Sequence, residues 1–534
     1  MNAAGADAQT CRPPGAAGGH AGRMQQDHME SLVKAKSSSY DVIVIGGGNA
    51  GLCAALSACE GGASVLVLER SSPEKRGGNS AFTGGGFRMV HHGTDDVRAL
   101  VPDLTEEEIA NTDFGQYTAE DYLDDLGRVT QYYIDPDLAE TLVRSSNETV
   151  RWLHGQGVRF EPRFGRYAFK HDGKFKFFGG VVVNAKGGGR GLVEYLFKAA
   201  EKRGVQVRYG VRASALLRGP DGIEGVRLTA AGKEETLGAR AVVLACGGFE
   251  ANREMRTRYL GPGWDMAKVR GTRFNQGDGI RMALDIGAQS YGQWSGCHAV
   301  QWERYAPDFG DIDARGSSQR HSYPFGIVVN ADGRRFVDEG ADFRNYTYAK
   351  YGRIVLQQPG SFAWQVFDQQ VTHMLREDYR LRGATKVQGN TLEELADRMQ
   401  DVHPRQFIET VSEFNAAVKR DVPLNPNIKD GRCTTGLALN KSNWANPIEK
   451  PPFEAYSVGC GITFTFGGVK IDTTTHVLDI EDAPIPGLYA AGELVGGLYY
   501  FNYPGSAGLM GGAVFGRIAG REAARHACQE AAAA

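Results

Sequence analysis

The sequence predicts an α/β protein in which a discontinuous Rossmann-like domain is interrupted by an inserted α+β domain. First, the apolar run 41–45 is followed by a glycine-rich turn and a helical stretch, as in a βαβ unit. Second, between residues 293 and 435 the pattern changes to mixed polar and aromatic segments with few apolar runs. Third, apolar strand patterns return near the C-terminus, so the first domain should resume after the insertion.

The elements of the first domain can be predicted in order along the chain. Strands are expected at the short apolar runs 41–45, 63–68, 205–209, 241–245, 468–471 and 487–491. Helices are expected at 51–60, 118–130, 136–155, 190–203 and 505–526. The domain borders predicted from these patterns are 39–292 and 436–534 for the first domain and 293–435 for the second.

The charge balance excludes one broad class of function. Lys and Arg number 60 and Asp and Glu 63, for a formal charge of -3, so a strongly basic nucleic-acid-binding surface is not expected.

The chain has no apolar stretch of about 18 residues, so we expect no integral membrane segment. Residues 1–38 are rich in Ala, Gly and polar residues and are predicted to be a disordered leader, with a transit peptide as the alternative.

The cysteine pattern bears on metals and on the compartment. The eight Cys residues are scattered without C-x-x-C pairs or Cys/His spacing, so no zinc or iron–sulfur site is expected. They indicate thiols in a reducing, cytoplasmic compartment.

Glycine is the outlier in the composition, at 71 of 534 residues or about 13%, against roughly 7% in average proteins. The backbone therefore has to approach something closely.

A dinucleotide-binding fingerprint follows the first predicted strand. Gly46, Gly48 and Gly51 have the G-x-G-x-x-G spacing, and Glu69 ends the next strand. In this pattern the first glycine permits a tight turn, the second lets the backbone approach a pyrophosphate, and the third allows close helix–strand packing. The carboxylate accepts hydrogen bonds from a ribose, while the helix N-terminus attracts the phosphates. The fingerprint does not choose between NAD and FAD.

A second glycine-rich segment, 76–86 (RGGNSAFTGGG), follows the Glu69 strand. With this segment the chain resembles the fumarate reductase/succinate dehydrogenase flavoprotein family. Further matching blocks are VVLACGGFEAN (242–252), NQGDGIRMALDIGA (275–288), GRRFVDE (333–339), PGLYAAGE (486–493) and FGRIAG (515–520). Within the family, the blocks 270–276, 325–343, 351–360 and 451–472 are most similar to FAD-dependent tricarballylate dehydrogenases.

This resemblance implies an FAD-binding domain, an inserted capping domain and FAD as the cofactor. Family members with covalent flavin carry a His where this chain has Asn79, so the FAD should be non-covalent. The positions implied as FAD contacts are Gly46, Gly48, Asn49, Ala50, Gly51, Glu69, Arg70, Gly78, Asn79, Ser80, Thr83, Gly85, Gly86, Val211, Ala245, Gly247, Asp278, Glu493, Ser506 and Leu509.

The resemblance also implies catalytic residues. Arg335 matches the family arginine that exchanges a proton with substrate from the capping domain, although pairing with Asp338 or Glu339 is the structural alternative. His298 matches a histidine that holds a substrate carboxylate. A neutral or charged imidazole suits that role because its pKa lies near neutrality.

Departures from the family bear on the substrate. Thr463–Phe466 stands where fumarate reductases carry a His, and Tyr503 stands where they carry a carboxylate-binding Arg. Fumarate or succinate is therefore not expected. A Tyr at this position resembles the ketosteroid dehydrogenase branch, but that branch's other catalytic Tyr falls on Phe343 here.

We therefore predict an FAD-dependent dehydrogenase, or reductase, acting on a C–C bond next to a carboxyl or carbonyl group. The favoured small-molecule substrate is a tricarballylate-like polycarboxylate, and a cyclic ketone or aromatic-pathway intermediate is the alternative. A redox-neutral isomerase and an electron-transfer subunit of a larger complex stay open. An electron-acceptor protein is the other partner that such chemistry calls for.

Overall fold

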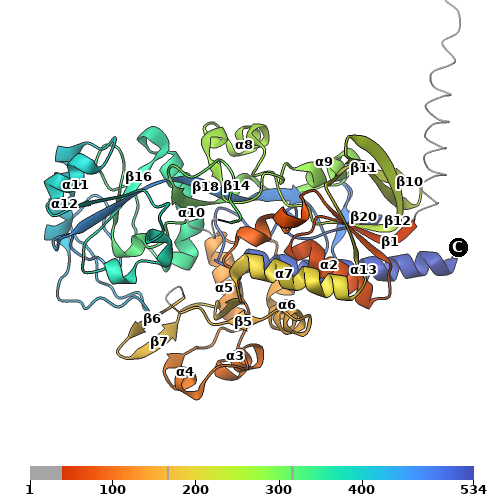
Figure 1. Cartoon of the computed structure of the whole chain (residues 1–534), viewed down its shortest axis with the longest axis horizontal. Coiled ribbons are helices and arrows are strands. Elements are labelled where there is room, and N and C mark those ends of the chain that lie inside the picture. Colours follow the sequence, from red (N-terminus) through yellow and green to blue (C-terminus); the bar gives the residue numbers. More distant parts are fainter. Residues whose placement is uncertain (1–38, 165–166, 314–317, 534) are drawn as a thin grey trace, which may run out of the picture.

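The computed structural model describes residues 39–164, 167–313 and 318–533, so the predicted leader lies outside the described residues. Two large sheets lie side by side along the long axis of the molecule (Figure 1). The larger sheet contains β1 (Ser39–Ile45), β2 (Val65–Glu69), β9 (Gln206–Tyr209), β10 (Val211–Gly219), β11 (Gly222–Ala230), β12 (Lys233–Leu244), β19 (His476–Leu478) and β20 (Pro484–Ala490).

Five parallel strands form the centre of this sheet, in the order β9-β2-β1-β12-β20. In their register Val44 lies between Val67 and Val243. The side chains of this row are fully buried, which explains the continuous apolar runs that predicted the strands. The first half of β12 instead pairs antiparallel with β11. The β10–β11 hairpin is an element that the sequence analysis does not predict.

The helices around the larger sheet are α2 (Asn49–Glu60), α3 (Thr94–Leu100), α4 (Glu106–Ala110), α5 (Ala119–Val129), α6 (Pro136–Gly155), α7 (Gly188–Lys202), α8 (Arg253–Leu260), α9 (Asp278–Asp285) and α13 (Ala507–Ala533). Helices α2, α9 and α13 pack on strands of this sheet, whereas α7 packs on α2, α6 on α13 and α5 on α6. The predicted helices are confirmed, and the Thr118 side chain caps α5. Helix α13 packs directly on α2. A Cβ at Gly516 or Gly520 would lie 2.4 or 2.1 Å from a backbone oxygen of α2, so only glycine permits this approach.

The second sheet combines strands of the predicted insertion, 293–435, with two strands from outside these borders. It contains β13 (Lys268–Val269), β14 (Ser290–Glu303), β15 (Ile327–Val329), β16 (Ala363–Phe367), β17 (Lys386–Gly389) and β18 (Phe453–Val469), with helices α10 (Arg344–Leu356), α11 (Leu392–Arg398) and α12 (Pro404–Ala417). Trp364, Phe407 and Phe414 lie in a separate buried core between this sheet and α12. The predicted fold class, a discontinuous α/β domain with an α+β insertion, is confirmed.

The antiparallel pair of long strands β14 and β18, called the β14–β18 ribbon below, connects the two parts. Strand β18 pairs with β16 and β17 through its first residues and with β14 through the rest, and it crosses the middle of the molecule in Figure 1. The predicted border at residue 293 lies inside β14, and the borders themselves stay predictions. The β14–β18 register shifts on both sides of the pair Cys297–His298.

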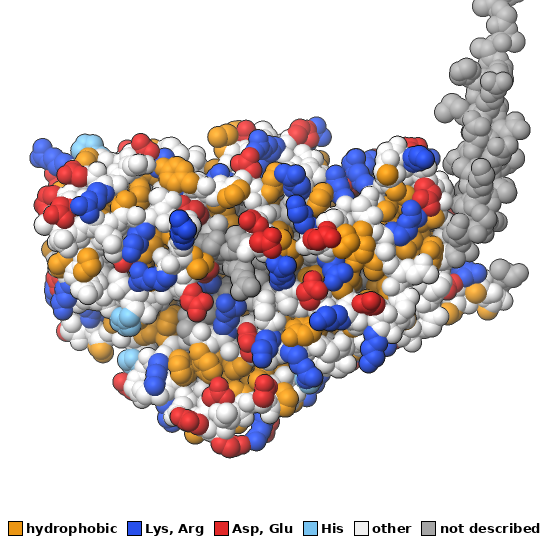
Figure 2. All heavy atoms as spheres, viewed as in Figure 1, with side chains coloured by type: hydrophobic (Ala, Val, Ile, Leu, Met, Phe, Trp, Pro, Cys, Tyr) orange, Lys and Arg blue, Asp and Glu red, His pale blue; other side chains and the backbone are white. Residues whose placement is uncertain are grey.

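Two small three-stranded sheets complete the described structure. One contains β3 (Gly86–Phe87), β5 (Phe160–Glu161) and β8 (Val183–Ala185), and the other β4 (Thr112–Asp113), β6 (Ala168–His171) and β7 (Lys174–Phe177). No helix within the described ranges is both long and apolar enough to cross a membrane. On the face drawn in Figure 2, basic and acidic side chains are interspersed.

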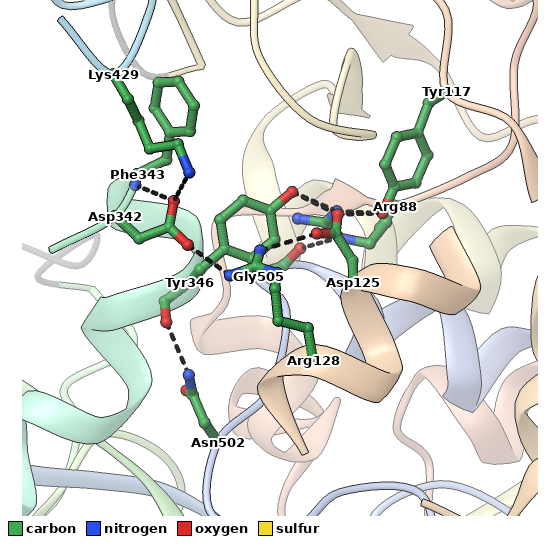
Figure 3. A network of polar contacts seen from close by, with 10 residues as sticks. All are labelled: Arg88, Tyr117, Asp125, Arg128, Asp342, Phe343, Tyr346, Lys429, Asn502 and Gly505. Atoms are coloured by element: carbon green, nitrogen blue, oxygen red, sulfur yellow. Dashed lines mark hydrogen bonds and ion pairs between the residues drawn. The ribbon is translucent and has the colours of Figure 1, made fainter. Parts of the chain in front are cut away.

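A polar network joins α5 to the inserted part (Figure 3). One oxygen of Asp125 accepts hydrogen bonds from Arg88 (3.1 Å), Tyr117 (2.6 Å) and Tyr346 of α10 (2.5 Å). The other oxygen accepts from Arg128 (2.9 Å). The Arg88 side chain is completely buried, so Asp125 supplies the carboxylate that such a charge requires.

The network continues on both sides of Asp125. Arg128 also pairs with Asp342 (2.6 Å), two residues before α10 begins. Arg88 donates to the carbonyl oxygen of Gly505 (3.0 Å), just before α13. Asn502 in the same loop donates to the Tyr346 carbonyl oxygen (2.7 Å). The start of α10 is therefore bound both to α5 and to the loop that leads into α13.

Replacing Asp125 by Asn should lower the free energy of unfolding by about 3 kcal/mol, because it leaves the buried Arg88 without its carboxylate. Urea denaturation would measure the change. The matched control is Asp124→Asn, at the exposed neighbouring position, which should change stability by no more than about 0.5 kcal/mol. Equal effects of the two substitutions would contradict the role assigned to Asp125.

Candidate active site

One cavity extends from the β1–α2 turn to the start of α10. It brings together most of the residues predicted from the sequence. The predicted positions on its wall are Gly46, Gly48, Asn49, Ala50, Glu69, Arg70, Gly78, Asn79, Ser80, Thr83, Gly86, Val211, Ala245, Gly247, Asp278, His298, Glu493, Tyr503, Ser506 and Leu509. Gly51, Gly85 and Arg335 are not on this wall.

The three fingerprint glycines differ in what surrounds them. Gly46 has a φ of 111°, and a Cβ there would lie 2.3 Å from the Ala245 oxygen. A Cβ on Gly51 would lie 1.9 Å from the Gly46 oxygen. At Gly48 the nearest atom is 3.5 Å away, the Ser80 hydroxyl oxygen. Gly46 and Gly51 therefore allow the turn and the packing, whereas Gly48 leaves cavity space open next to the backbone.

Glu69 ends β2 at the edge of the cavity and is buried. Its two oxygens accept backbone N–H bonds from Gly47 (3.1 Å) and Ser71 (2.8 Å). Each carboxylate oxygen can accept a further hydrogen bond. The side chain is thus fixed where a ribose hydroxyl can reach it, and the open backbone at Gly48 beside the α2 N-terminus suits a pyrophosphate. These residues fit a bound dinucleotide.

Asn79 and the second glycine-rich segment line the middle of the cavity. Asn79 donates to Glu250 (2.6 Å) and to the Thr463 carbonyl oxygen (2.7 Å), and it accepts from the Thr272 N–H (2.9 Å). An amide cannot form the covalent flavin link that a histidine forms, so this residue fits a non-covalent cofactor. Gly85 lies behind the wall, where a Cβ would be 2.7 Å from the Gly188 backbone.

Sequence reasoning misses a buried acidic pair next to this segment. Glu250 is fully buried and accepts hydrogen bonds from Asn79 and Asn275 (both 2.6 Å). Burial, together with the adjacent Glu493 carboxylate, raises the pKa of Glu250 well above its usual range. Burial raises the pKa of Glu493 as well, so the pair favours a shared proton over two negative charges. Glu493 accepts from the Thr465 N–H (2.9 Å).

Tyr503 lies at the other end of the cavity, in the loop before α13. Its hydroxyl oxygen accepts hydrogen bonds from the Tyr348 hydroxyl (2.9 Å) and from the Ser506 backbone N–H (2.8 Å). Because both bonds use the oxygen as acceptor, the hydroxyl hydrogen of Tyr503 is available to a bound acceptor. Burial raises the pKa of Tyr503 well above its usual range, so the group stays a donor at neutral pH.

His298 is at the irregular point of the β14–β18 ribbon, where a register shift re-aims a side chain. Its ring is within 5.1 Å, centroid to centroid, of Tyr348, Phe464 and Tyr503. Neither ring nitrogen has a hydrogen-bond partner among the described residues. Burial and then the Arg270 charge lower the pKa of His298 well below its usual range. A neutral imidazole with free nitrogens therefore faces the cavity.

Arg335 is bound elsewhere in the inserted part. Its guanidinium donates to Glu339 (2.6 and 3.1 Å) and to the Leu439 carbonyl oxygen (2.7 Å), and its side chain is 5% exposed. This is the ion pair that the sequence analysis gives as the structural alternative. The placement argues against the predicted proton exchange, because a guanidinium outside the cavity cannot reach a substrate within it.

Arg344 is the arginine of the inserted part that lines the cavity. It is the first residue of α10, and its guanidinium lies over the rings of Tyr167 (5.4 Å) and Tyr348 (5.3 Å). Arg270 and His321 also line this end. Sequence reasoning assigns no role to these three residues. The one signal in the sequence is that Arg344 directly follows the 325–343 block of the family resemblance.

Comparisons with known proteins agree with this geometry. Residues 41–509 match the family model described as FAD binding domain. The chain is 29% identical to the probable fumarate reductase Ifc3 of Shewanella frigidimarina, over 94% of this chain and 78% of that protein. It is 30% identical to the 4-oxocyclohexanecarboxylate 2-dehydrogenase of Sinomonas cyclohexanicum, over 90% and 92%.

A solved structure of a fumarate reductase is similar to this chain as well. The open conformation of a flavocytochrome c3 fumarate reductase is similar with a TM-score of 0.69 and 28% identity, over 94% of this chain and 81% of that chain. The family match covers most of the chain, and FAD is its cofactor. The chain therefore belongs to the FAD binding domain family of fumarate reductase-like flavoproteins, and it is an FAD-dependent oxidoreductase acting on CH–CH groups.

Proposed function

We propose that the chain dehydrogenates, or in reverse reduces, a C–C bond next to a carboxyl group, and that its substrate is a tricarballylate-like polycarboxylate. The observation that carries the proposal is the cluster of Arg270, His298, His321 and Arg344 at the Tyr503 end of the cavity. The acidic residues on the described wall, Glu69, Asp278 and Glu493, come from the elements of the dinucleotide end. An anionic substrate is favoured where two guanidinium groups converge.

The proposed work of each residue follows from its geometry. Arg344 and Arg270 neutralise and orient substrate carboxylates, and His298 offers a ring N–H to the same groups. Bound FAD supplies hydride exchange at its N5 atom. When the proton leaves the neighbouring carbon, negative charge develops on a carboxyl or carbonyl oxygen. The Tyr503 hydroxyl hydrogen stabilises that oxygen, since two other donors already hold the hydroxyl in place.

We assign proton exchange at the substrate carbon to Arg344 instead of Arg335. The resemblance places an arginine of the capping domain over the substrate, and Arg344 is the arginine of the insertion that lines the cavity. Its stacking on Tyr167 and Tyr348 holds the guanidinium in one orientation. The surrounding aromatic rings limit access of water to the transfer.

A cyclic keto acid is the second candidate substrate. The relative from Sinomonas cyclohexanicum is named for an oxocyclohexanecarboxylate, which carries both a ring ketone and a carboxylate. Phe464, Tyr499 and Tyr503 line the cavity with ring centroids 5.2 to 5.8 Å apart. Such walls suit a ring, and the Tyr503 hydroxyl would then polarise the ketone.

Gly48→Val should abolish FAD binding while the chain still folds, because its side chain would occupy open cavity space. Gly51→Val should instead prevent folding, since its Cβ would collide with the Gly46 backbone. The flavin-to-protein absorbance ratio and the circular dichroism of both purified variants would show this. A yellow Gly48→Val protein would contradict the proposed path of the cofactor.

Tricarballylate should bleach the flavin absorbance near ~450 nm under anaerobic conditions, and Arg344→Gln should remove this bleaching while the protein stays yellow. The comparison variant is Arg335→Gln, which should lower stability by breaking its ion pair with Glu339 but keep the bleaching. Bleaching by cyclic keto acids and by none of the polycarboxylates would favour the second candidate. Loss of bleaching only in Arg335→Gln would restore the role predicted from the sequence.

Tyr503→Phe should reduce kcat by about 10²- to 10³-fold, the usual effect of removing one donor to a developing oxyanion. FAD content should be unchanged. Tyr499→Phe is the control, because Tyr499 lies on the same wall but its hydroxyl has no hydrogen-bond partner among the described residues. Steady-state turnover with an artificial electron acceptor would measure both. Similar rates for Tyr503→Phe and the parent protein would exclude the oxyanion role.

A further inference from the structure

We propose that Asn345 binds the substrate, through a carboxamide N–H that donates to an oxygen of the carboxyl group next to the reacting carbon. This role rests on the proposed function and adds a residue that sequence reasoning does not single out. Asn345 is the second residue of α10, directly after Arg344, and it lines the main cavity. It therefore lies beside the guanidinium that exchanges the proton.

The carboxamide of Asn345 has an unpaired donor. The residue is 1% exposed, and its Nδ2 atom has no hydrogen-bond partner among the described residues. An amide NH2 group carries two donor hydrogens. Leaving such a group unsatisfied in a protein interior is unfavourable, and buried polar groups are nearly always paired. An acceptor oxygen of a bound ligand would satisfy it.

Arg344 fixes the orientation of this carboxamide. Nη2 of Arg344 lies 2.5 Å from Oδ1 of Asn345. Because a guanidinium only donates, the amide oxygen must face Arg344, and the NH2 group is on the other side of the amide. The backbone is held as well, since the Asn345 carbonyl oxygen accepts from the Gly505 N–H (2.8 Å). A donor that is already in place loses little freedom when a ligand binds.

The face of α10 that carries Asn345 borders the cavity. Asn345, Tyr348 and Gly352 share one side of the helix, because they are three and seven positions apart. Tyr348 lines the cavity, and its ring centroid lies 5.0 Å from that of His298. Gly352 packs on β14, where a Cβ would lie 2.4 Å from the Val300 backbone nitrogen. Asn345 is therefore on the side of α10 that faces β14 and the His298 end of the cavity.

The position of Asn345 indicates which substrate group it binds. The free part of its carboxamide can only donate, so it suits an oxygen that only accepts, such as that of a carboxylate. The Asn345–Gly505 backbone bond holds the residue next to the loop that carries Tyr503. We therefore assign one oxygen of the reacting carboxyl group to the Tyr503 hydroxyl and the other to Asn345. An uncharged amide adds direction to this binding without another charge.

The test measures how the FAD-loaded full chain binds tricarballylate. The anaerobic rate of flavin bleaching is followed against tricarballylate concentration, which gives a dissociation constant for each variant. Asn345→Asp keeps the oxygen that faces Arg344 but lacks the NH2 group, whereas Asn345→Leu lacks both and adds no charge. Both substitutions should raise the dissociation constant at least about tenfold, because each leaves a carboxylate oxygen without its donor. FAD content should stay unchanged.

The matched control is Asn443, a buried asparagine outside the cavity whose Nδ2 donates to the Gly340 carbonyl oxygen (2.9 Å). Asn443→Leu should keep the dissociation constant but lower the urea midpoint, because it leaves a buried acceptor unpaired. Asn345→Leu should lower the midpoint less, since it removes a donor that is unpaired in the ligand-free protein. A merely structural role of Asn345 would give the reverse, a lower midpoint with an unchanged dissociation constant.

Each outcome decides one point. Unchanged dissociation constants in both Asn345 variants would overturn this role and leave the polycarboxylate function standing. A rise in Asn345→Asp alone would show charge repulsion, and a rise in Asn345→Leu alone would show that only the contact with Arg344 matters, so either would overturn the role of the NH2 group. If Asn345→Leu does not fold, Asn345→Ala replaces it in the comparison. A yellow parent protein that tricarballylate does not bleach would overturn the polycarboxylate function and the role of Asn345 together.

Discussion

The arrangement of the site depends on how the first turn of α10 is held against the loop before α13. The Gly505 N–H donates to the Asn345 carbonyl oxygen (2.8 Å), and the Asn502 side chain donates to the next carbonyl oxygen of the same turn. This short contact sets Arg344, at the start of α10, relative to Tyr503. The Asp125 network holds the same turn from the other side. Without these contacts Arg344 and Tyr503, which both line the cavity, would belong to two parts of the chain that are not held against each other.

The two ends of the cavity carry different chemical groups. The β1–α2 turn, Glu69 and the glycine-rich segment offer backbone and carboxylate groups suited to a dinucleotide, whereas the ends of α10 and β14 offer arginines and histidines. His298 is kept neutral by burial, and Tyr503 is kept protonated by the same cause. The low dielectric around these buried groups thus keeps His298 uncharged and keeps Tyr503 protonated, as a hydrogen-bond donor. Fixed donors of this kind stabilise developing charge without reorganising.

Much of the fold is predictable from the sequence because its signals are local. The apolar strands, the Thr118 cap and the glycine turn of β1–α2 each depend on a few adjacent residues. The long strands β14 and β18 are not predictable in this way beyond the expected strand 468–471, because glycines such as Gly296 in β14 and Gly461 in β18 interrupt their apolar pattern and only pairing makes them strands. Arg335 and Arg344 show the same limit at the site. They are nine positions apart, and only the tertiary packing decides which guanidinium is in the cavity and which pairs with Glu339.

The β14–β18 ribbon has a mechanical consequence. Two continuous paired strands resist sliding, because every ladder hydrogen bond would have to break at once, whereas an irregularity in the register bends the strand and increases its twist. The interruption lies at Cys297–His298, between the larger sheet and the insertion. The bend that the irregular register introduces is therefore located at a residue whose ring lines the cavity. The direction in which the imidazole points depends on the course of the paired strands at this bend.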